Sequence, residues 1–497
     1  MSLPSDFLWG FATAAYQIEG AVEQDGRAPT IWDTFCNRPG KIADGSSGTT
    51  ACDSYNRTAD DIALLKSLGA TAYRFSLSWT RIIPLGGRND PVNQPGLDHY
   101  VKFVHDLLAA GITPFVTLLH WDVPDELDKR YGGLLDKTEF GLDFEHYARV
   151  CFRAMPEVKH WATFNEPWCS AVLGYNVGQF APGRTSDRTK SSEGDGTTEP
   201  WIAAHTLLVA HGRAVKSYRD EFKAAAQGEI GIVLNGDAVF PWDPADPRDV
   251  EACERKIEFA ISWFADPIYK GDYPESMKRQ LGSRLPTFTL EEAALVHGSN
   301  DFYGMNHYTA NYVKNRPGTP DPEDVGGHID LLFYNKRGFC IGEETQSPWL
   351  RPCAAGFRDL MVWISKRYNY PKIYITENGT SIKGENDLPM EKILDDDFRV
   401  RYYDDYVRAM ATAVSLDGVD VRGYFAWSLM DNFEWAEGYE TRFGVCYVDY
   451  DNGQKRFPKK SARFLGPLFD KLIRKEGQGR FTLMASTLQV KLHCEEN

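Results

Sequence analysis

The sequence has no excess of basic side chains. Its 55 lysine and arginine residues are outnumbered by 70 aspartate and glutamate residues, giving a formal net charge of −15. Nucleic acids and anionic membrane surfaces bind clustered positive charge, so this balance argues against either partner. The sequence also lacks any run approaching ~18 consecutive apolar residues, so no membrane-spanning segment is expected. It contains no tandem repeat, which excludes a solenoid.

Cysteine is scarce and follows no motif. The nine cysteines are an odd number and include no C-x-x-C pair, which argues against zinc-knuckle, thioredoxin-like and iron–sulfur sites. A dispersed set of this kind is typical of a reducing compartment. The first residues, MSLPSDFLWG, show no basic region followed by a long apolar run, so no signal peptide is expected. We therefore expect a cytoplasmic protein.

The overall composition is that of a folded enzyme domain with surplus aromatic residues. Hydrophobic residues make up 42% and charged residues 25% of the 497 positions, which is ordinary for a globular protein. The 13 Trp, 24 Tyr and 28 Phe residues exceed what a core needs. Length alone suggests several domains, but α/β barrels of this size fold as single units. We expect one domain spanning residues 1–497.

Short runs rich in aromatic and β-branched residues alternate with amphipathic segments of helical length. The runs lie at 7–16, 71–79, 113–120, 160–166, 229–236, 301–309, 372–379 and 422–429, and helical patterns include 60–69, 97–111, 201–219, 251–264 and 397–414. Several helical patterns close on glycine (Gly69, Gly111 and Gly418). Eight strand–helix units predict an α/β fold, a single (β/α)8 TIM barrel. Such a barrel needs about 250 residues, so long βα loops must hold the remainder. The polar segments 185–198 and 315–328 are predicted loops.

Polar and aromatic residues gather at the carboxyl end of every predicted strand, where barrel enzymes place their catalytic groups. They are Gln17, Arg74, Trp79, His120, Trp121, Asn165, Glu166, Asn235, Asn306, His307, Tyr308, Glu377 and Trp427. Buried polar groups cost free energy unless they are paired. The pattern therefore predicts a site that hydrogen-bonds a ligand rich in hydroxyl groups.

Two carboxylic acids stand out in this set, Glu166 after the fourth run and Glu377 after the seventh. Across a barrel mouth they could bind a metal, act as acid and base, or flank a glycosidic bond. No H-E-x-x-H motif or aspartate cluster accompanies His120, which disfavours a metal, and no cofactor is expected. Glycoside cleavage needs such a pair of carboxyl groups. Tryptophan rings also suit the apolar faces of sugars, so a small carbohydrate is the expected substrate.

Five segments carry a resemblance to a known family. They are F-L-W-G-F-A-T-A-A-Y-Q-I-E-G at 7–20, L-L-H-W-D-V-P at 118–124, T-F-N-E-P at 163–167, Y-I-T-E-N-G at 374–379 and W-S-L-M-D-N-F-E-W at 427–435. Together they resemble the signature segments of the family 1 glycoside hydrolases, and in particular the intracellular fungal β-glucosidases. The resemblance covers nearly the whole chain.

The resemblance implies a role for each matching residue. Glu166 is expected to be the general acid and then the general base, and Glu377 the nucleophile of a retaining double displacement. Retention predicts carboxyl groups about 5–5.5 Å apart. Asn165 is expected to hold the sugar 2-OH, with Gln17, His120, Trp121, Glu434 and Trp435 binding the rest of the glycone and Trp427 forming its floor. Arg74 and Tyr308 are expected beside Glu377, with Asn306 completing the polar shell.

The two acids need opposite protonation states. Glu377 is expected to be ionised, with a low pKa, and Glu166 protonated, because of its apolar surroundings and the charge of Glu377. These states predict a bell-shaped pH–rate profile in the mildly acidic range. An N-glycosylation sequon at Asn378 directly follows Glu377, and a glycan there would obstruct the pocket, so we expect it to be unused.

Departures from the family pattern narrow the substrate. A phosphorylated sugar would meet the like charge of Glu434, and the acid missing from thioglucosidase relatives is present as Glu166. Trp168, Leu173 and Trp349 are interpreted either as the wall of the aglycone entrance or as plain packing residues. Glucosides, with cellobiose, short cello-oligosaccharides and aryl β-glucosides as examples, are favoured over galactosides and fucosides. A catalytically silent sugar-binding protein and a metal-dependent barrel hydrolase are the competing hypotheses, and the oligomeric state is not predicted.

Overall fold

The structure is a computed structural model of the protein that describes residues 2–473. The ends of the predicted domain, residues 1 and 474–497, lie outside the described part, as does Cys494. No helix within the described residues combines the length and the apolar character that crossing a membrane requires.

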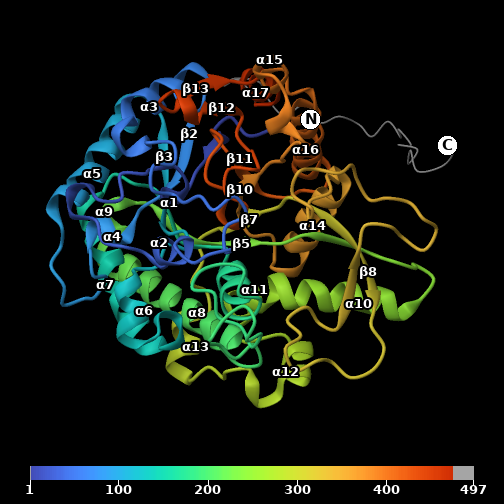
Figure 1. Ribbon diagram of the computed structural model, residues 1–497. Coiled ribbons are helices and arrows are strands. Elements are labelled where there is room, and N and C mark those ends of the chain that lie inside the picture. Colours follow the sequence, from blue (N-terminus) through green and yellow to red (C-terminus); the bar gives the residue numbers. More distant parts are fainter. Residues whose placement is uncertain (1, 474–497) are drawn as a thin grey trace.

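Eight parallel strands close into a barrel at the centre of the molecule (Figure 1). Around the ring the order is β1-β11-β10-β7-β5-β4-β3-β2. The strands are β1 Leu8–Ala12, β2 Ala72–Ser76, β3 Thr113–Leu119, β4 His160–Asn165, β5 Glu229–Asn235, β7 Tyr303–Asn306, β10 Ile373–Asn378 and β11 Val421–Trp427. Each lies within, or one residue outside, one of the eight predicted runs. The predicted (β/α)8 fold is therefore confirmed.

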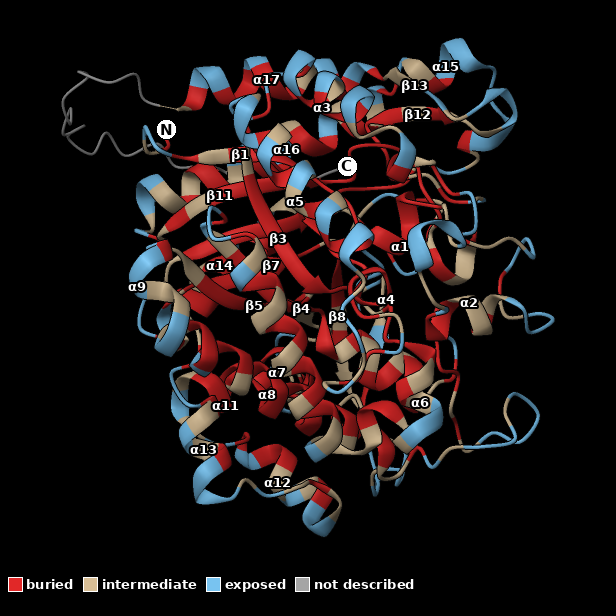
Figure 2. Cartoon of the chain, turned by 90° about the vertical axis from the view of Figure 1, so that its left-hand side faces the viewer, coloured by how far each residue is buried: buried red, intermediate tan, exposed pale blue. Residues whose placement is uncertain are grey.

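Rings fill the interior of the barrel below the strand ends. Phe115 on β3 contacts Phe425 at 5.2 Å, Tyr374 at 5.3 Å, Phe302 at 5.4 Å and His160 at 5.5 Å between ring centroids. These residues come from strands on several sides of the ring, so they close the barrel as a packed core. Figure 2 shows the buried strands in the middle of the molecule and the exposed surface on the outer helices.

The long helices follow the strands and cover the barrel from outside. They are α3 Thr58–Ser67, α5 Gln94–Ala109, α7 Lys137–Ala154, α8 Glu199–Ser217, α10 Pro247–Ile257, α11 Trp263–Lys270, α14 Ala354–Arg367, α16 Asp397–Leu416 and α17 Lys460–Leu472. Gly69, Gly111 and Gly418 follow α3, α5 and α16 with φ of 78°, 78° and 73°, the left-handed conformation of a helix stop. The pattern at 251–264 is not one α-helix, because a π-helical turn at Glu258–Ser262 separates α10 from α11.

Shorter elements build the loops. The short helices are α1 Ala15–Ile18, α2 Ile31–Cys36, α4 Trp79–Ile82, α6 Asp125–Tyr131, α9 Lys223–Ala226, α12 Glu275–Leu281, α13 Leu290–Val296 and α15 Met390–Leu394. A small sheet contains β6 Ala238–Pro241, β8 Ala310–Asn315 and β9 Ile329–Leu332, and a hairpin pairs β12 Cys446–Asp449 with β13 Lys455–Pro458. Residues 185–198 form turns and bends, as do residues 316–328.

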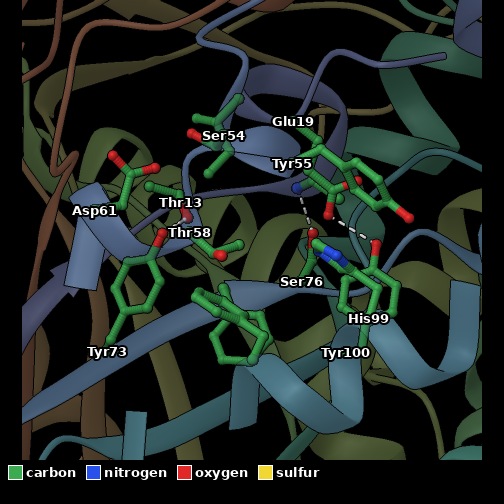
Figure 3. A pocket seen from close by; sticks show the side chains of 14 residues that line it. Thr13, Glu19, Ser54, Tyr55, Thr58, Asp61, Tyr73, Ser76, His99 and Tyr100 are labelled. Carbon is green, nitrogen blue, oxygen red and sulfur yellow. Dashed lines mark hydrogen bonds between the residues drawn. The ribbon is translucent and has the colours of Figure 1, made fainter. Parts of the chain in front are cut away.

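An internal cavity of about 20 Å³ is lined by residues that include Tyr73, Ser76 and Tyr100 (Figure 3). Its polar groups are largely satisfied from within. Tyr100 donates to Glu19 at 2.7 Å, and the backbone N–H of Ala15 donates to the Ser76 hydroxyl at 2.7 Å. The cavity has room for a water molecule but not for a sugar.

Candidate active site

A hydrogen-bonded network joins the carboxyl ends of four barrel strands. Arg74, in the middle of β2, donates from Nη1 to Glu377 Oε1 at 2.7 Å and from Nη2 to Asn165 Oδ1 at 2.7 Å. Asn306 Nδ2 donates to the same Asn165 oxygen at 3.0 Å and to Glu166 Oε1 at 2.7 Å. The sheet register sets Glu377 directly beside Asn306. The structure thus brings together five of the predicted residues.

Glu377 is buried and held on both carboxylate oxygens. Besides the bond from Arg74, Tyr308 donates its hydroxyl to Oε2 at 2.6 Å. The charge of Glu377, after burial, raises the pKa of the Tyr308 hydroxyl well above its usual value, so Tyr308 stays a donor. Two fixed donors of this kind orient a carboxylate for attack on a carbon atom above it.

The surroundings of Glu166 favour its protonated form. Burial, then the charge of Glu377, raises the pKa of Glu166 from 4.5 to about 8. Asn306, Cys169 and Arg74 oppose the rise without cancelling it. The backbone of Glu166 has φ of 45°, in the left-handed region that side chains rarely adopt, and such strain concentrates at functional sites. Glu166 is therefore protonated at neutral pH, while Glu377 accepts hydrogen bonds from Arg74 and Tyr308.

Buried polar atoms without a protein partner surround the two acids. Gln17 donates from Nε2 to Asn432 Oδ1 at 2.9 Å and to the Phe433 carbonyl at 2.8 Å, but its Oε1 has no partner. Asn165 and His120 Nε2 lie 3.0 Å apart, and the other ring nitrogen of His120 is also unpaired. Burial and the charge of Arg74 lower the pKa of His120 well below its usual value, so its ring is neutral. A hydroxyl-rich ligand would satisfy these atoms.

Three tryptophan rings and His120 form the aromatic wall of the site. His120 stacks on Trp427 and on Trp435, with ring centroids 5.8 Å apart in each case. Trp121 packs on Trp435 at 4.6 Å and donates its indole N–H to the Asn165 carbonyl at 2.9 Å. Trp121 and Trp435 have φ of 72° and 49°, so backbone strain recurs here. Burial, then the charges of Glu437, Glu377 and Glu166, raises the pKa of Glu434 well above its usual range.

The three residues predicted for the aglycone side have different surroundings. Trp349 is 45% exposed and meets Tyr308 edge-on at 5.8 Å, which links it to the Glu377 end of the site. Trp168 is half-buried under the Lys256 ammonium group, 5.5 Å from the ring centroid, and its indole N–H is unpaired. Leu173 is half-buried at the end of the π-helical turn Cys169–Leu173 (η4).

Two residues that the sequence predicts at the site, Trp79 and His307, pack against outer helices instead. Trp79 stacks on Tyr147 of α7 at 4.7 Å, and His307 packs on Phe357 of α14 at 4.9 Å. Trp79 begins the short helix α4 and His307 follows the end of β7, so both lie just beyond the strands, where residue type alone does not reveal the direction of a side chain. Asn378 is buried and bonded to the His307 carbonyl and to Tyr402, so its sequon is inaccessible in the folded chain.

Two further residues of this network were not predicted from the sequence. Asn432 holds the amide of Gln17, and it lies inside the resembling segment 427–435, where the signal was available. Cys169 Sγ donates to Glu166 Oε2 at 3.1 Å. No motif marked it, because the contact depends on the π-helical turn. Within residues 2–473, no group of three or more His, Cys, Asp or Glu side chains is placed to hold a metal ion.

Comparison with known proteins decides the family. The profile described as Glycosyl hydrolase family 1 matches residues 1–477. The chain belongs to this family. Family 1 membership and the likeness to curated β-glucosidases make it an enzyme of the β-glucosidase type, and the resemblance seen in the sequence is confirmed.

The similarity to known β-glucosidases covers nearly the full length of this chain. "Beta-glucosidase 1B" of Phanerodontia chrysosporium is 54% identical over 94% of this chain and 85% of its own length. A family 1 β-glucosidase from the fungus Humicola insolens, solved in complex with glucose, superposes with a TM-score of 0.95 at 72% identity, covering 96% of this chain and all of the other. A rice β-glucosidase mutant in a covalent complex with Glc gives 0.91 at 43% identity, covering 95% and 99%.

Proposed function

We propose that the enzyme is a retaining β-glucosidase that removes terminal non-reducing β-D-glucosyl residues from cellobiose, short cello-oligosaccharides and aryl β-glucosides, with side activity on β-galactosides and β-fucosides. The different surroundings of the two acids carry the proposal: burial and the charge of Glu377 keep Glu166 protonated, while Arg74 and Tyr308 donate to the two carboxyl oxygens of Glu377. The covalent glucose complex of the rice relative supports retention.

In the first half-reaction, Glu377 attacks the anomeric carbon while Glu166 gives its proton to the departing oxygen. The bond from Glu377 to the sugar removes the carboxylate charge that had raised the pKa of Glu166. Glu166 can then ionise and take a proton from water, which attacks the glycosyl-enzyme from the same face as the departed group. This sequence requires carboxyl groups about 5–5.5 Å apart.

The glycone is proposed to bind through the unpaired atoms of Gln17 and His120, with Glu434 and Trp435 completing the contacts and Trp427 under the ring. The glucose complex of the Humicola insolens relative supports a sugar in this position. Trp168, Leu173 and Trp349 are proposed to line the aglycone side. Buried free thiols at Cys52, Cys151 and Cys446 support a reducing, cytoplasmic location.

The deciding experiment replaces Glu377 with glycine and adds azide. We expect the variant to be inactive on nitrophenyl β-glucoside and to recover with azide, yielding the α-glucosyl azide, because azide enters on the face that the nucleophile vacates. In Glu166→Ala, azide should instead yield the β-glucosyl azide by attacking the glycosyl-enzyme. Activity retained by Glu377→Gly without azide would remove this residue from the nucleophile role.

A further inference from the structure

Asn306 settles which oxygen of Glu166 carries the transferable proton. Asn306 Nδ2 also donates to Asn165 Oδ1 at 3.0 Å, an oxygen that accepts from Arg74, and this contact fixes the amide so that its nitrogen also faces Glu166. An amide N–H can only donate, so the oxygen it contacts, Oε1, must be an acceptor in both protonation states of Glu166. The carbonyl oxygen of a carboxylic acid is a better acceptor than its hydroxyl oxygen, so the bond from Asn306 favours the proton of the acid form on Oε2.

Cys169 is the protein group in contact with that second oxygen. Its sulfur lies 3.1 Å from Oε2, and its backbone N–H donates to the Glu166 carbonyl at 3.0 Å, so the two residues are joined at both side chain and main chain. Burial, then the charge of Glu166, keeps the pKa of the thiol well above its usual value, and the group stays neutral. A thiol can donate to a carboxylate and can also turn its sulfur toward an acid proton.

We propose that Cys169 is a positioning residue for the acid/base, a reversible partner of Glu166 Oε2 that stabilises the ionised form and holds this oxygen toward the leaving group. The inference rests on the proposed role of Glu166. An S–H donor favours the carboxylate, so its removal should raise the pKa of Glu166 further. It should also leave Oε2 without lateral support, which matters only when a proton must be delivered.

Other charged groups act on the same pair and stay in place in the test. They are Glu377 of β10, Arg74 of β2, Tyr308 after β7 and Glu434 before the Trp435–Glu437 turn, together with Asp237 and Lys256, which face Cys169. None of them contacts Glu166 Oε2 among the described hydrogen bonds, so replacing the thiol isolates its own contribution.

The test compares the pH profiles of Cys169→Ala and Cys169→Ser on two substrates. With methyl β-glucoside, whose leaving group needs a proton, Cys169→Ala should lose about fivefold to tenfold in kcat/KM. Its alkaline limb should move up by about half a unit to one unit. With 2,4-dinitrophenyl β-glucoside, which leaves unprotonated, kcat/KM should change little. Cys169→Ser keeps a donor, so its alkaline limb should return to that of the parent or below it.

Cys151→Ala is the matched control, because this buried thiol on α7 lies beside Tyr147 and contacts no carboxylate. It should leave both profiles unchanged. An alkaline limb unmoved in Cys169→Ala, or equal losses on both substrates, would overturn the inference. Glu166→Gln separates this failure from that of the proposed function. If this variant loses the limb while Cys169→Ala does not shift it, only Cys169 is misassigned; if it keeps the limb, both assignments fall.

Discussion

At the scale of single residues, the burial of Glu166 that suits an acid catalyst also lowers the free energy of unfolding. Glu166 sits where burial and Glu377 raise its pKa from 4.5 to about 8. A group whose pKa is higher in the folded chain than in the unfolded one contributes stability below its unfolded pKa and loses it as pH rises through the folded value. Glu166 therefore destabilises the fold progressively between about pH 4.5 and pH 8.

Glu166→Gln should remove this penalty. We expect the Tm of the variant to exceed that of the parent by about 2–4 °C at pH 8. The gain should be smaller at pH 5, where the parent is already protonated. Thermal unfolding at the two pH values measures both. Glu139→Gln, on a partly exposed carboxylate of α7, controls for loss of a charge. An equal gain at both pH values would contradict the raised pKa.

Trp168 provides a second test at this scale. Trp168 follows Glu166 by two positions in the chain, its half-buried ring lies under Lys256, and its indole N–H is unpaired. Trp168→Ala should change the ratio of kcat/KM between cellobiose and nitrophenyl β-glucoside by about tenfold and alter inhibition by glucose. If Tm falls sharply while this ratio stays the same, Trp168 is a packing residue.

At the scale of elements, the strand ends could be predicted and the turns could not. Parallel strands bring their carboxyl ends to one rim, so Arg74, Glu166 and Glu377 could be placed together from sequence. Trp79 and His307 could not be placed correctly, because both lie just beyond a strand end, where the backbone turns and the strand pattern no longer sets the direction of a side chain. The π-helical turns at Cys169–Leu173 and Glu258–Ser262 have no sequence signal of their own.

The contact between the ends of β10 and β11 depends on one glycine. A Cβ atom at Gly379 would lie 1.8 Å from the Trp427 carbonyl oxygen and 3.3 Å from the Tyr403 hydroxyl. Gly379→Ala must therefore push the Trp427 floor away from Glu377. We expect a loss of about 1–3 kcal/mol in stability and a higher KM for glucosides. Gly326→Ala, whose nearest neighbour would lie at 3.8 Å, should change neither measurement.

At the scale of the whole molecule, a buried charge network ties the C-terminal segment to the barrel rim. Lys459, fully buried before α17, donates to Glu385 at 2.7 Å and to Asp431 at 3.0 Å. Arg399 pairs with Glu385, and Arg442 pairs with Asp431. The segment that begins at Asp431 carries Glu434 and Trp435, so the network also supports the side of the site proposed to bind the glycone. The overall fold could be predicted from the alternation of strand and helix patterns in the sequence. This charge network could not be predicted, because it joins residues that lie far apart in the sequence.

Lys459→Met should leave two buried carboxylates short of a partner. We expect the free energy of unfolding to fall by about 3–5 kcal/mol. The neighbouring Lys460 makes only exposed pairs, so Lys460→Met should cost about 0–1 kcal/mol. Urea denaturation of both variants checks the contrast. Arg399 and Lys459 hold the pKa of Glu385 at about 2, so parental stability should decline as pH falls from 4.5 toward 2.

The rings packed around Phe115 fill the barrel below the two glutamates. Because this end of the barrel is filled, substrate and product are expected to enter and leave at the carboxyl ends of the strands. A product molecule that stays bound at the entrance would therefore block the entry of the next substrate molecule. Inhibition by product should therefore depend on how quickly the residues at the rim of the barrel release it. We expect substitutions that relieve this inhibition to lie at the rim, not at Glu166 or Glu377.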